Sequence, residues 1–79
     1  MSDDLLRYNR HGLAGALRRL AHDAALAAAT VIDDGALPHE EAAAIDGVMG
    51  RIESVRHART LLNATRAGAR AAADNRRTA

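Results

Sequence analysis

The stretch VIDDGALPH, residues 31–39, interrupts an otherwise uniform helical pattern and decides the fold. Asp33, Asp34 and Gly35 favour a turn, because short polar residues and glycine are typical of tight reversals of the chain. Pro38 fits the first turn of a new helix, where its missing N–H has no cost. This stretch therefore predicts that one helix ends and a second begins.

No other proline interrupts the chain, so the two helices are expected to be long. We predict a first helix over about 3–32, a turn over 33–37 and a second helix over about 38–72. Residues 73–79 are expected to fray in solvent, as chain ends without packing partners do. Residues 1–79 then form a single domain.

Apolar residues recur every seven positions on both sides of the turn. The first half has the rows Leu6, Leu13, Leu20, Ala27 and Leu17, Ala24, Val31, and the second half has Ile45, Ile52, Arg59, Arg66 and Val48, Val55, Leu62, Ala69. This heptad spacing predicts left-handed packing of long helices, and no segment alternates as a strand would. The short connection makes the two helices antiparallel neighbours. We predict an all-α fold, an antiparallel helical hairpin.

The composition indicates that one hairpin has a thin core. Alanine supplies more than half of the apolar residues, Phe and Trp are absent, and Tyr8 is the only aromatic residue among 79. Two hairpins packed together share a core, so we expect a homodimer that forms a four-helix bundle. Four glycines are expected where helices approach closely: Gly12, Gly15, Gly47 and Gly50.

Positive charge is concentrated in the last third of the chain, although the net charge is only +1. Arg59 and Arg66 fall on a heptad row where an apolar residue would stabilise more, and Arg70 follows them. Polar residues at such positions often set the choice of partner. Alternatively, the seam opens at its end and these arginines extend their side chains into water. We therefore expect a small adaptor or regulator that binds another protein through Arg59, Arg66 and Arg70. The alternative is a nucleic-acid-binding hairpin whose arginines neutralise phosphates, although aromatic residues for base stacking are lacking.

The segment LRRLAHD, residues 17–23, places the pair His22 and Asp23 inside the first helix. At about 100° per residue, His22 points away from the leucine stripe and is expected to be exposed. The pair is then either part of a solvated polar face or a phosphorylatable histidine with an acidic neighbour.

The arrangement resembles the dimerisation and phosphotransfer domain of sensor histidine kinases, a helical hairpin that dimerises into a four-helix bundle. In that family the phosphoacceptor histidine lies on the outer face of the first helix, commonly followed by an acid. The resemblance implies His22 as phosphoacceptor with Asp23 beside it, and SVRHARTLL, residues 54–62, as the arginine-bearing segment of the second helix. The family pattern continues with a polar residue and often a Pro-Leu pair, and AALAAAT, residues 24–30, has neither.

Other chemistry finds little support, and we expect no enzyme, cofactor or metal. The chain has no cysteine, and no Ser, acid and His set suggests a nucleophile. His11 and His22 are separated by about 16 Å along a helix, too far to share an ion. The loop acids lack the spacing of a calcium-binding EF-hand.

The apolar run AALAAATVI, residues 24–32, is about half the length that a bilayer span needs. The first residues, MSDDLLRYNR, carry acids where a signal peptide carries positive charge. We expect a cytoplasmic protein without membrane association.

Overall fold

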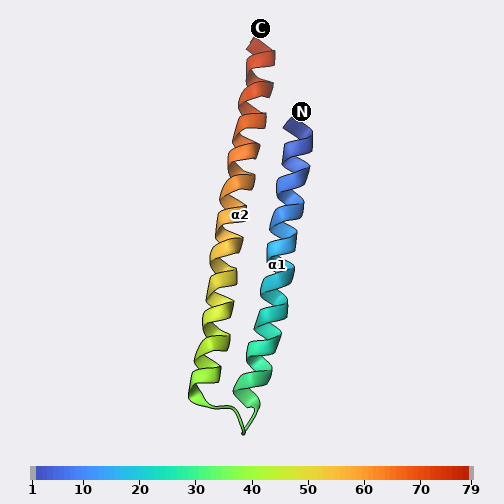
Figure 1. Ribbon diagram of the computed structural model, residues 1–79. Coiled ribbons are helices and arrows are strands. Elements are labelled where there is room, and N and C mark those ends of the chain that lie inside the picture. The colour runs from blue at the N-terminus through green and yellow to red at the C-terminus, as the bar shows by residue number, and fades with distance from the viewer. Residues whose placement is uncertain (1, 79) are drawn as a thin grey trace.

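The computed structural model describes the backbone of residues 2–78 and the side chains of residues 3–76. Helix α1 spans Ser2–Ile32 and helix α2 spans Pro38–Thr78. They lie side by side and antiparallel, joined by the turn at one end (Figure 1). The predicted all-α helical hairpin is confirmed, and residues 2–78 contain no strand.

The turn is closed by hydrogen bonds that begin at Asp33. Its N–H donates to the Thr30 carbonyl at 3.2 Å, and its own carbonyl accepts from the Ala36 N–H at 3.0 Å. Its carboxylate Oδ1 accepts from the Gly35 N–H at 2.9 Å, which is an Asx turn. The aspartate at the end of α1 thus directs the chain reversal.

The second helix starts as the sequence predicts. The Leu37 carbonyl accepts from the N–H groups of Glu40 at 2.9 Å and Glu41 at 3.2 Å, so Pro38 sits in the first turn and loses no hydrogen bond. The two glutamates carry negative charge at the helix N-terminus, where the dipole favours it.

Helix α2 extends to Thr78, whereas the sequence predicted an end near residue 72. The residues after Gly68 are mostly Ala and Arg, which are strong helix formers, and none is glycine or proline. The last turns of α2 therefore extend beyond the start of α1 (Figure 1). Residues 71–76 are exposed.

The two helices touch along one line of residues, which we call the seam, and every seam residue is buried or half-buried. In α1 the seam consists of Leu6, Asn9, Leu13, Ala16, Leu20, Asp23, Ala27 and Thr30. In α2 it consists of Glu41, Ala44, Val48, Arg51, Val55, Ala58, Leu62, Thr65 and Ala69. These positions alternate by three and four residues, the spacing of a coiled coil.

Only one of the two predicted rows in each helix belongs to the seam. Leu17 is 47% exposed, Val31 51% and Ile45 49%, and Arg59 and Arg66 are exposed too. The prediction that these residues lie between the helices is wrong, because the second seam row of each helix lies one residue earlier in the sequence than the predicted row.

The observed packing is accompanied by two polar contacts across the seam. Arg51 Nε donates to Asp23 Oδ2 at 2.7 Å, and Asn9 Nδ2 donates to Thr65 Oγ1 at 2.6 Å. Each of these four side chains comes one residue before a residue of a predicted row that lies outside the seam. Rotating the helices to bury Leu17 or Ile45 would pull Asp23 and Arg51 apart.

The glycines do not mark close helix contact, which corrects a further prediction. A Cβ placed at Gly12, Gly47 or Gly50 would meet nothing within 4 Å, and at Gly15 it would meet only the guanidinium of Arg19. These glycines lie off the seam, where the helix surfaces diverge.

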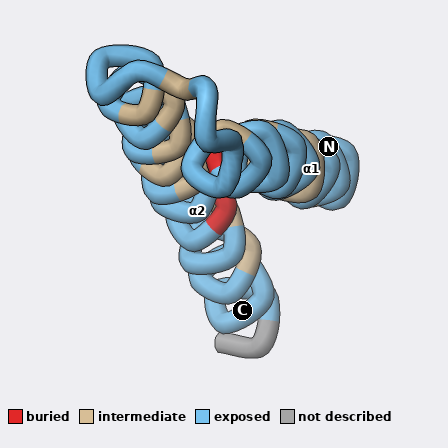
Figure 2. Tube along the Cα trace, turned by 90° about the horizontal axis from the view of Figure 1, so that it is seen from below, coloured by how far each residue is buried: buried red, intermediate tan, exposed pale blue. Residues whose placement is uncertain are grey.

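The hairpin is long and has almost no core. Only Ala16, Ala27 and Leu62 are buried among residues 3–76 (Figure 2). The molecule measures 67 × 15 × 13 Å, and its radius of gyration of 18.5 Å exceeds the roughly 12 Å of a compact chain of this length. Its accessible surface is 6153 Å², whereas a compact protein of 8.3 kDa exposes about 4,600 Å².

Candidate functional site

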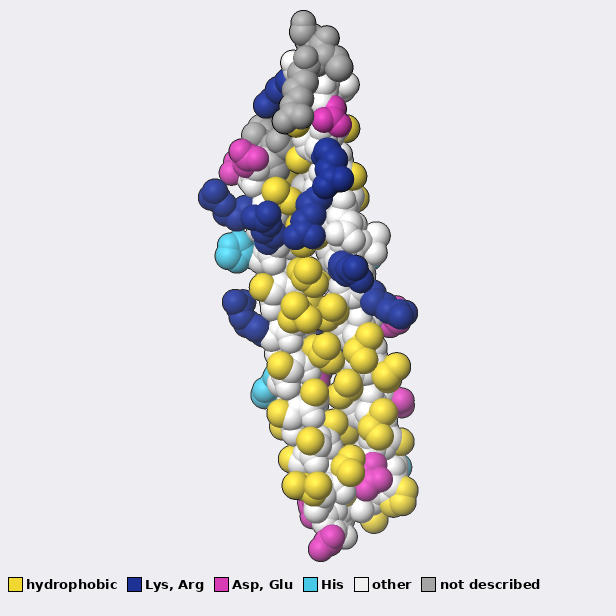
Figure 3. All heavy atoms as spheres, turned by 180° about the vertical axis from the view of Figure 1, so that it is seen from behind, with side chains coloured by type: hydrophobic (Ala, Val, Ile, Leu, Met, Phe, Trp, Pro, Cys, Tyr) yellow, Lys and Arg dark blue, Asp and Glu magenta, His cyan; other side chains and the backbone are white. Residues whose placement is uncertain are grey.

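One broad side of the hairpin is apolar from the turn to about the middle of the molecule. We call this surface the apolar face, and it comprises Leu17, Ala21, Ala24, Ala28 and Val31 of α1 and Ala42, Ile45, Met49 and Ile52 of α2. Met49 is 55% exposed, and Ile52 is the one half-buried member. Figure 3 shows hydrophobic side chains gathered over this part of the molecule, beneath a group of arginines.

The shared side follows from helix geometry. Leu17, Ala24 and Val31 each come one residue after a seam position of α1, and Ile45 and Ile52 each come one residue after a seam position of α2. One residue turns a helix by about 100°. Because the helices are antiparallel, turning in the same sense about each axis leads to the same side of the pair. The two predicted rows that miss the seam therefore meet in one surface.

Arginines continue the same rows toward the open end of the hairpin. Arg10 extends the row of Leu17, and Arg59 and Arg66 extend the row of Ile52. We call the group with its neighbours the arginine cluster, and all six members are exposed: Arg7, Arg10, Arg56, Arg59, Arg66 and Arg70. The apolar face thus ends where the cluster begins (Figure 3).

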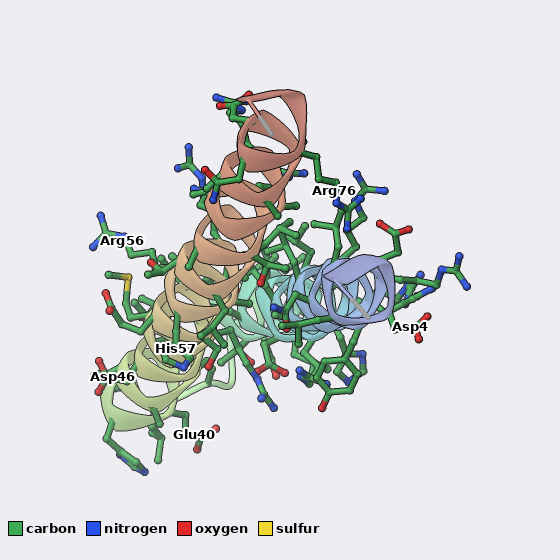
Figure 4. The ribbon with its side chains drawn as sticks, turned by 90° about the horizontal axis from the view of Figure 1, so that it is seen from above. Asp4, Glu40, Asp46, Arg56, His57 and Arg76 are labelled. Carbon is green, nitrogen blue, oxygen red and sulfur yellow. The ribbon has the colours of Figure 1, made fainter. Side chains whose placement is uncertain are left out.

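Few carboxylates compensate the cluster within the hairpin. Arg56 Nη1 lies 3.5 Å from Glu53 Oε1, both side chains being largely exposed, and Arg56 projects away from α1 (Figure 4). Arg66 Nη1 lies 3.5 Å from the amide oxygen of Asn63. Among the residues with described side chains, Arg10 and Arg59 have no acidic oxygen within 4.0 Å. These guanidinium groups are accessible to an anionic partner.

The sequence-predicted partner residues are brought to one side, but they do not occupy the seam. Arg59 and Arg66 lie two turns apart on α2, Arg70 lies one turn farther on, and all three are exposed. The arginine that does occupy the seam is Arg51, whose ion pair with Asp23 sequence reasoning missed. The heptad spacing of Asn9, Ala16, Asp23 and Thr30 would have revealed that row, yet it carries no large apolar residue.

The histidine pair is divided between two environments. His22 is exposed, as its place on the outer side of α1 predicts. Asp23 is half-buried, and its side chain is 25% exposed and bound to Arg51. Successive helix residues do not face each other. The Asp23 carboxylate is therefore engaged across the seam and does not orient the imidazole of His22.

The side opposite the apolar face carries two open hollows. One of about 280 Å³ is lined by residues that include Tyr8, Gly12, Arg19, His57 and Leu61. The other, of about 230 Å³, lies nearer the turn and includes Gly47. Both are smaller than typical ligand pockets, which enclose roughly 300–1,000 Å³. They arise where glycines leave space beside the seam.

Within the described residues, no three side chains of the His, Cys, Asp or Glu type come together in a way that could hold a metal ion. Neither helix, over that same part of the chain, has an apolar stretch sufficient to cross a membrane. Comparisons of the chain with models of protein families, with curated proteins and with solved structures find no match.

Proposed function

We propose that this chain is a small non-enzymatic adaptor or regulator that forms a homodimer and binds another protein. Two hairpins join through their apolar faces into a four-helix bundle, and the arginine cluster at the open end contacts the partner. The observation that carries the proposal is the apolar face itself, which the hairpin leaves uncovered although it is continuous over both helices (Figure 3).

The surface area supports association. The hairpin exposes about 1,600 Å² more than a compact protein of its mass, whereas one partner in a standard stable interface contributes roughly 800 Å². Covering the apolar face therefore falls within what a dimer can bury. Leu17, Val31, Ile45 and Met49, each about half exposed, supply the large side chains of that contact.

A second copy is the occupant that fits best, because the face is self-complementary. Large side chains such as Ile45 and Met49 stand beside the small side chains of Ala24 and Ala28, so ridges of one copy can fill the gaps of another. A four-helix bundle formed in this way has the knobs-into-holes packing that long helices with heptad spacing adopt.

A matched pair of substitutions tests the dimer. Ala24 lies on the apolar face, and its neighbour Ala25 is exposed on the outer side of the same helix turn. Ala24→Asp buries an unpaired charge in the dimer and should reduce the molar mass measured by light scattering to that of one chain. Ala25→Asp should leave the dimer intact. Equal behaviour of the two variants would exclude the apolar face as the interface.

The arginine cluster supports an acidic protein surface as the partner. Arginine presents a planar fork that matches carboxylates in bidentate pairs, and Arg66 and Arg70 are exposed beyond the apolar face. Binding to an oligoglutamate peptide, measured by calorimetry, should be detectable at about 50 mM salt and lost when Arg66 and Arg70 are both changed to Glu. Absence of binding by the wild type would contradict an acidic partner.

Nucleic acid is the second candidate, and the gathering of six arginines on one side of the hairpin favours it. Phosphate contacts by several arginines would make binding fall steeply between about 50 and 200 mM salt. The acidic turn favours the protein partner, and the one aromatic residue of the chain, the exposed Tyr8, lines the hollow on the side opposite the apolar face. Failure to bind RNA or DNA at low salt, together with binding of the acidic peptide, would separate the two.

A further inference from the structure

The charge of the hairpin changes sign between the turn and the arginine cluster. All the acidic residues from 33 to 46 lie at or near the turn, where no arginine occurs: Asp33, Asp34, Glu40, Glu41 and Asp46. The arginine cluster lies on the far side of the apolar face, toward the open end. Each hairpin therefore has an acidic tip, then an apolar segment, then a basic segment.

We infer that the two hairpins of the dimer are antiparallel, with the acidic turn of each copy lying against the first arginines of the other. This inference rests on the dimer proposed above and adds the orientation of the second copy. It identifies the first arginines as Arg10, Arg56 and Arg59.

The position of the apolar face along the hairpin determines how far the two copies overlap in the dimer. Leu17 to Val31 covers about 21 Å of α1, at a rise of 1.5 Å per residue. The middle of the face therefore lies about 12 Å from the ends of the helices at the turn. A two-fold axis through that point superimposes the two faces and leaves the rest of each hairpin outside the contact.

The same axis brings opposite charges together. It carries the turn of the second copy to about 25 to 30 Å from the turn of the first. Measured along the helices from their ends at the turn, Arg56 lies at about 27 Å, and Arg10 and Arg59 lie at about 32 Å. Asp33 and Asp34 of one copy then reach the level where the arginine cluster of the other copy begins.

A parallel dimer would place like charges side by side. With both turns at one end, Asp33 and Asp34 at the tip would lie at the level of the same two residues of the second copy, and Arg59 would face Arg59 of the second copy. Such contacts fall well within the Debye length of about 8 Å at physiological salt. Both orientations cover the apolar face, so charge decides between them.

The antiparallel arrangement also divides the cluster between two tasks. Arg10, Arg56 and Arg59 border the dimer contact. Arg66 and Arg70 lie about 10 Å or more farther along α2 and remain free for the partner. Each dimer then presents two such sites at opposite ends, so the adaptor is bivalent.

Distances between spin labels distinguish the orientations, and the chain has no cysteine to compete for the label. Gly35→Cys is suited to the turn, because a Cβ there meets only Asp33 Oδ1 at an ordinary 3.4 Å and the residue has no positive φ. Asn63→Cys is exposed on α2. Pulsed electron resonance should give separations of about 30 Å for the first label and about 50 Å for the second.

Two other results of the spin-label measurement would each contradict a different part of the proposal. Separations of about 20 Å or less at both sites, in a sample with the mass of two chains, would overturn the antiparallel arrangement and leave the dimer standing. The mass of one chain and no distance between labels would instead overturn the dimer on which the inference rests.

Charge reversal supplies an independent measurement. Arg59→Glu should raise the dimer dissociation constant roughly threefold to tenfold, because it opposes like charges at two symmetric contacts. Arg70→Glu, outside the overlap, is the matched control and should leave the constant unchanged. In a parallel dimer Arg59 would face its own copy, so reversal would only exchange one repulsion for another. An unchanged constant for Arg59→Glu would therefore contradict the inference.

Discussion

Neighbouring leucines in α2 provide a sharp test of how the hairpin is packed. Leu62 is 2% exposed in the seam, and Leu61 is 47% exposed on the side away from the apolar face. Leu62→Ala removes a buried side chain and leaves a cavity, which costs about 2 to 5 kcal/mol in protein cores. We expect the lower half of that range, about 2 to 3 kcal/mol, because the thin hairpin can partly collapse around the gap.

The control substitution is chemically identical. Leu61→Ala should cost less than about 1 kcal/mol, since surface changes are usually small and alanine favours the helix. Both variants are unfolded in urea and followed by circular dichroism at one protein concentration, because dimerisation makes apparent stability depend on concentration. A loss for Leu61→Ala equal to or larger than that for Leu62→Ala would refute the packing described here.

Three other variants probe the polar groups. Arg51→Ala should lower the free energy of unfolding by about 1 kcal/mol, because it leaves the half-buried Asp23 without its 2.7 Å partner; denaturation that matches the wild type would show that the pair contributes nothing. His22→Ala should leave mass and unfolding unchanged, and the wild type should acquire no acid-labile phosphate from ATP and magnesium; phosphate that disappears in this variant would favour phosphotransfer. Changing Arg66 and Arg70 to Glu should leave the melting temperature within about 2 °C, and a larger drop would mean that these arginines stabilise the fold.

The hairpin could be predicted because its signals are local. Asp33, Gly35 and Pro38 act within a few residues of the chain, and the Asx turn and the start of α2 depend on them directly. The length of α2 was underestimated because an alanine-rich end has helix propensity even without packing.

The packing of the helices could not be predicted from apolar spacing alone. Leu13 and Leu20 belong to one heptad row and Leu17 belongs to another, and both rows repeat every seven residues. The choice between them depends on contacts between residues far apart in the chain, such as Asn9 with Thr65. A pattern within one helix carries no information about such partners.

The candidate site could be predicted only in part, because its place on the hairpin also depends on how the two helices pack. The sequence identified Arg59, Arg66 and Arg70 as a group, and the structure places them together on one exposed side of α2. The heptad spacing predicts Arg59 and Arg66 in the seam, because they continue the row of Ile45 and Ile52. Once that row is turned outward, its apolar part becomes the apolar face and its basic part joins the arginine cluster.

We propose that the apolar face joins two copies of this chain. Sedimentation equilibrium of the unmodified protein, over a concentration range from about 1 to 100 μM, measures this most directly. Association through the apolar face predicts a molar mass that rises to twice 8.3 kDa, together with a melting temperature that increases with concentration. A mass that stays at 8.3 kDa throughout that range would contradict it.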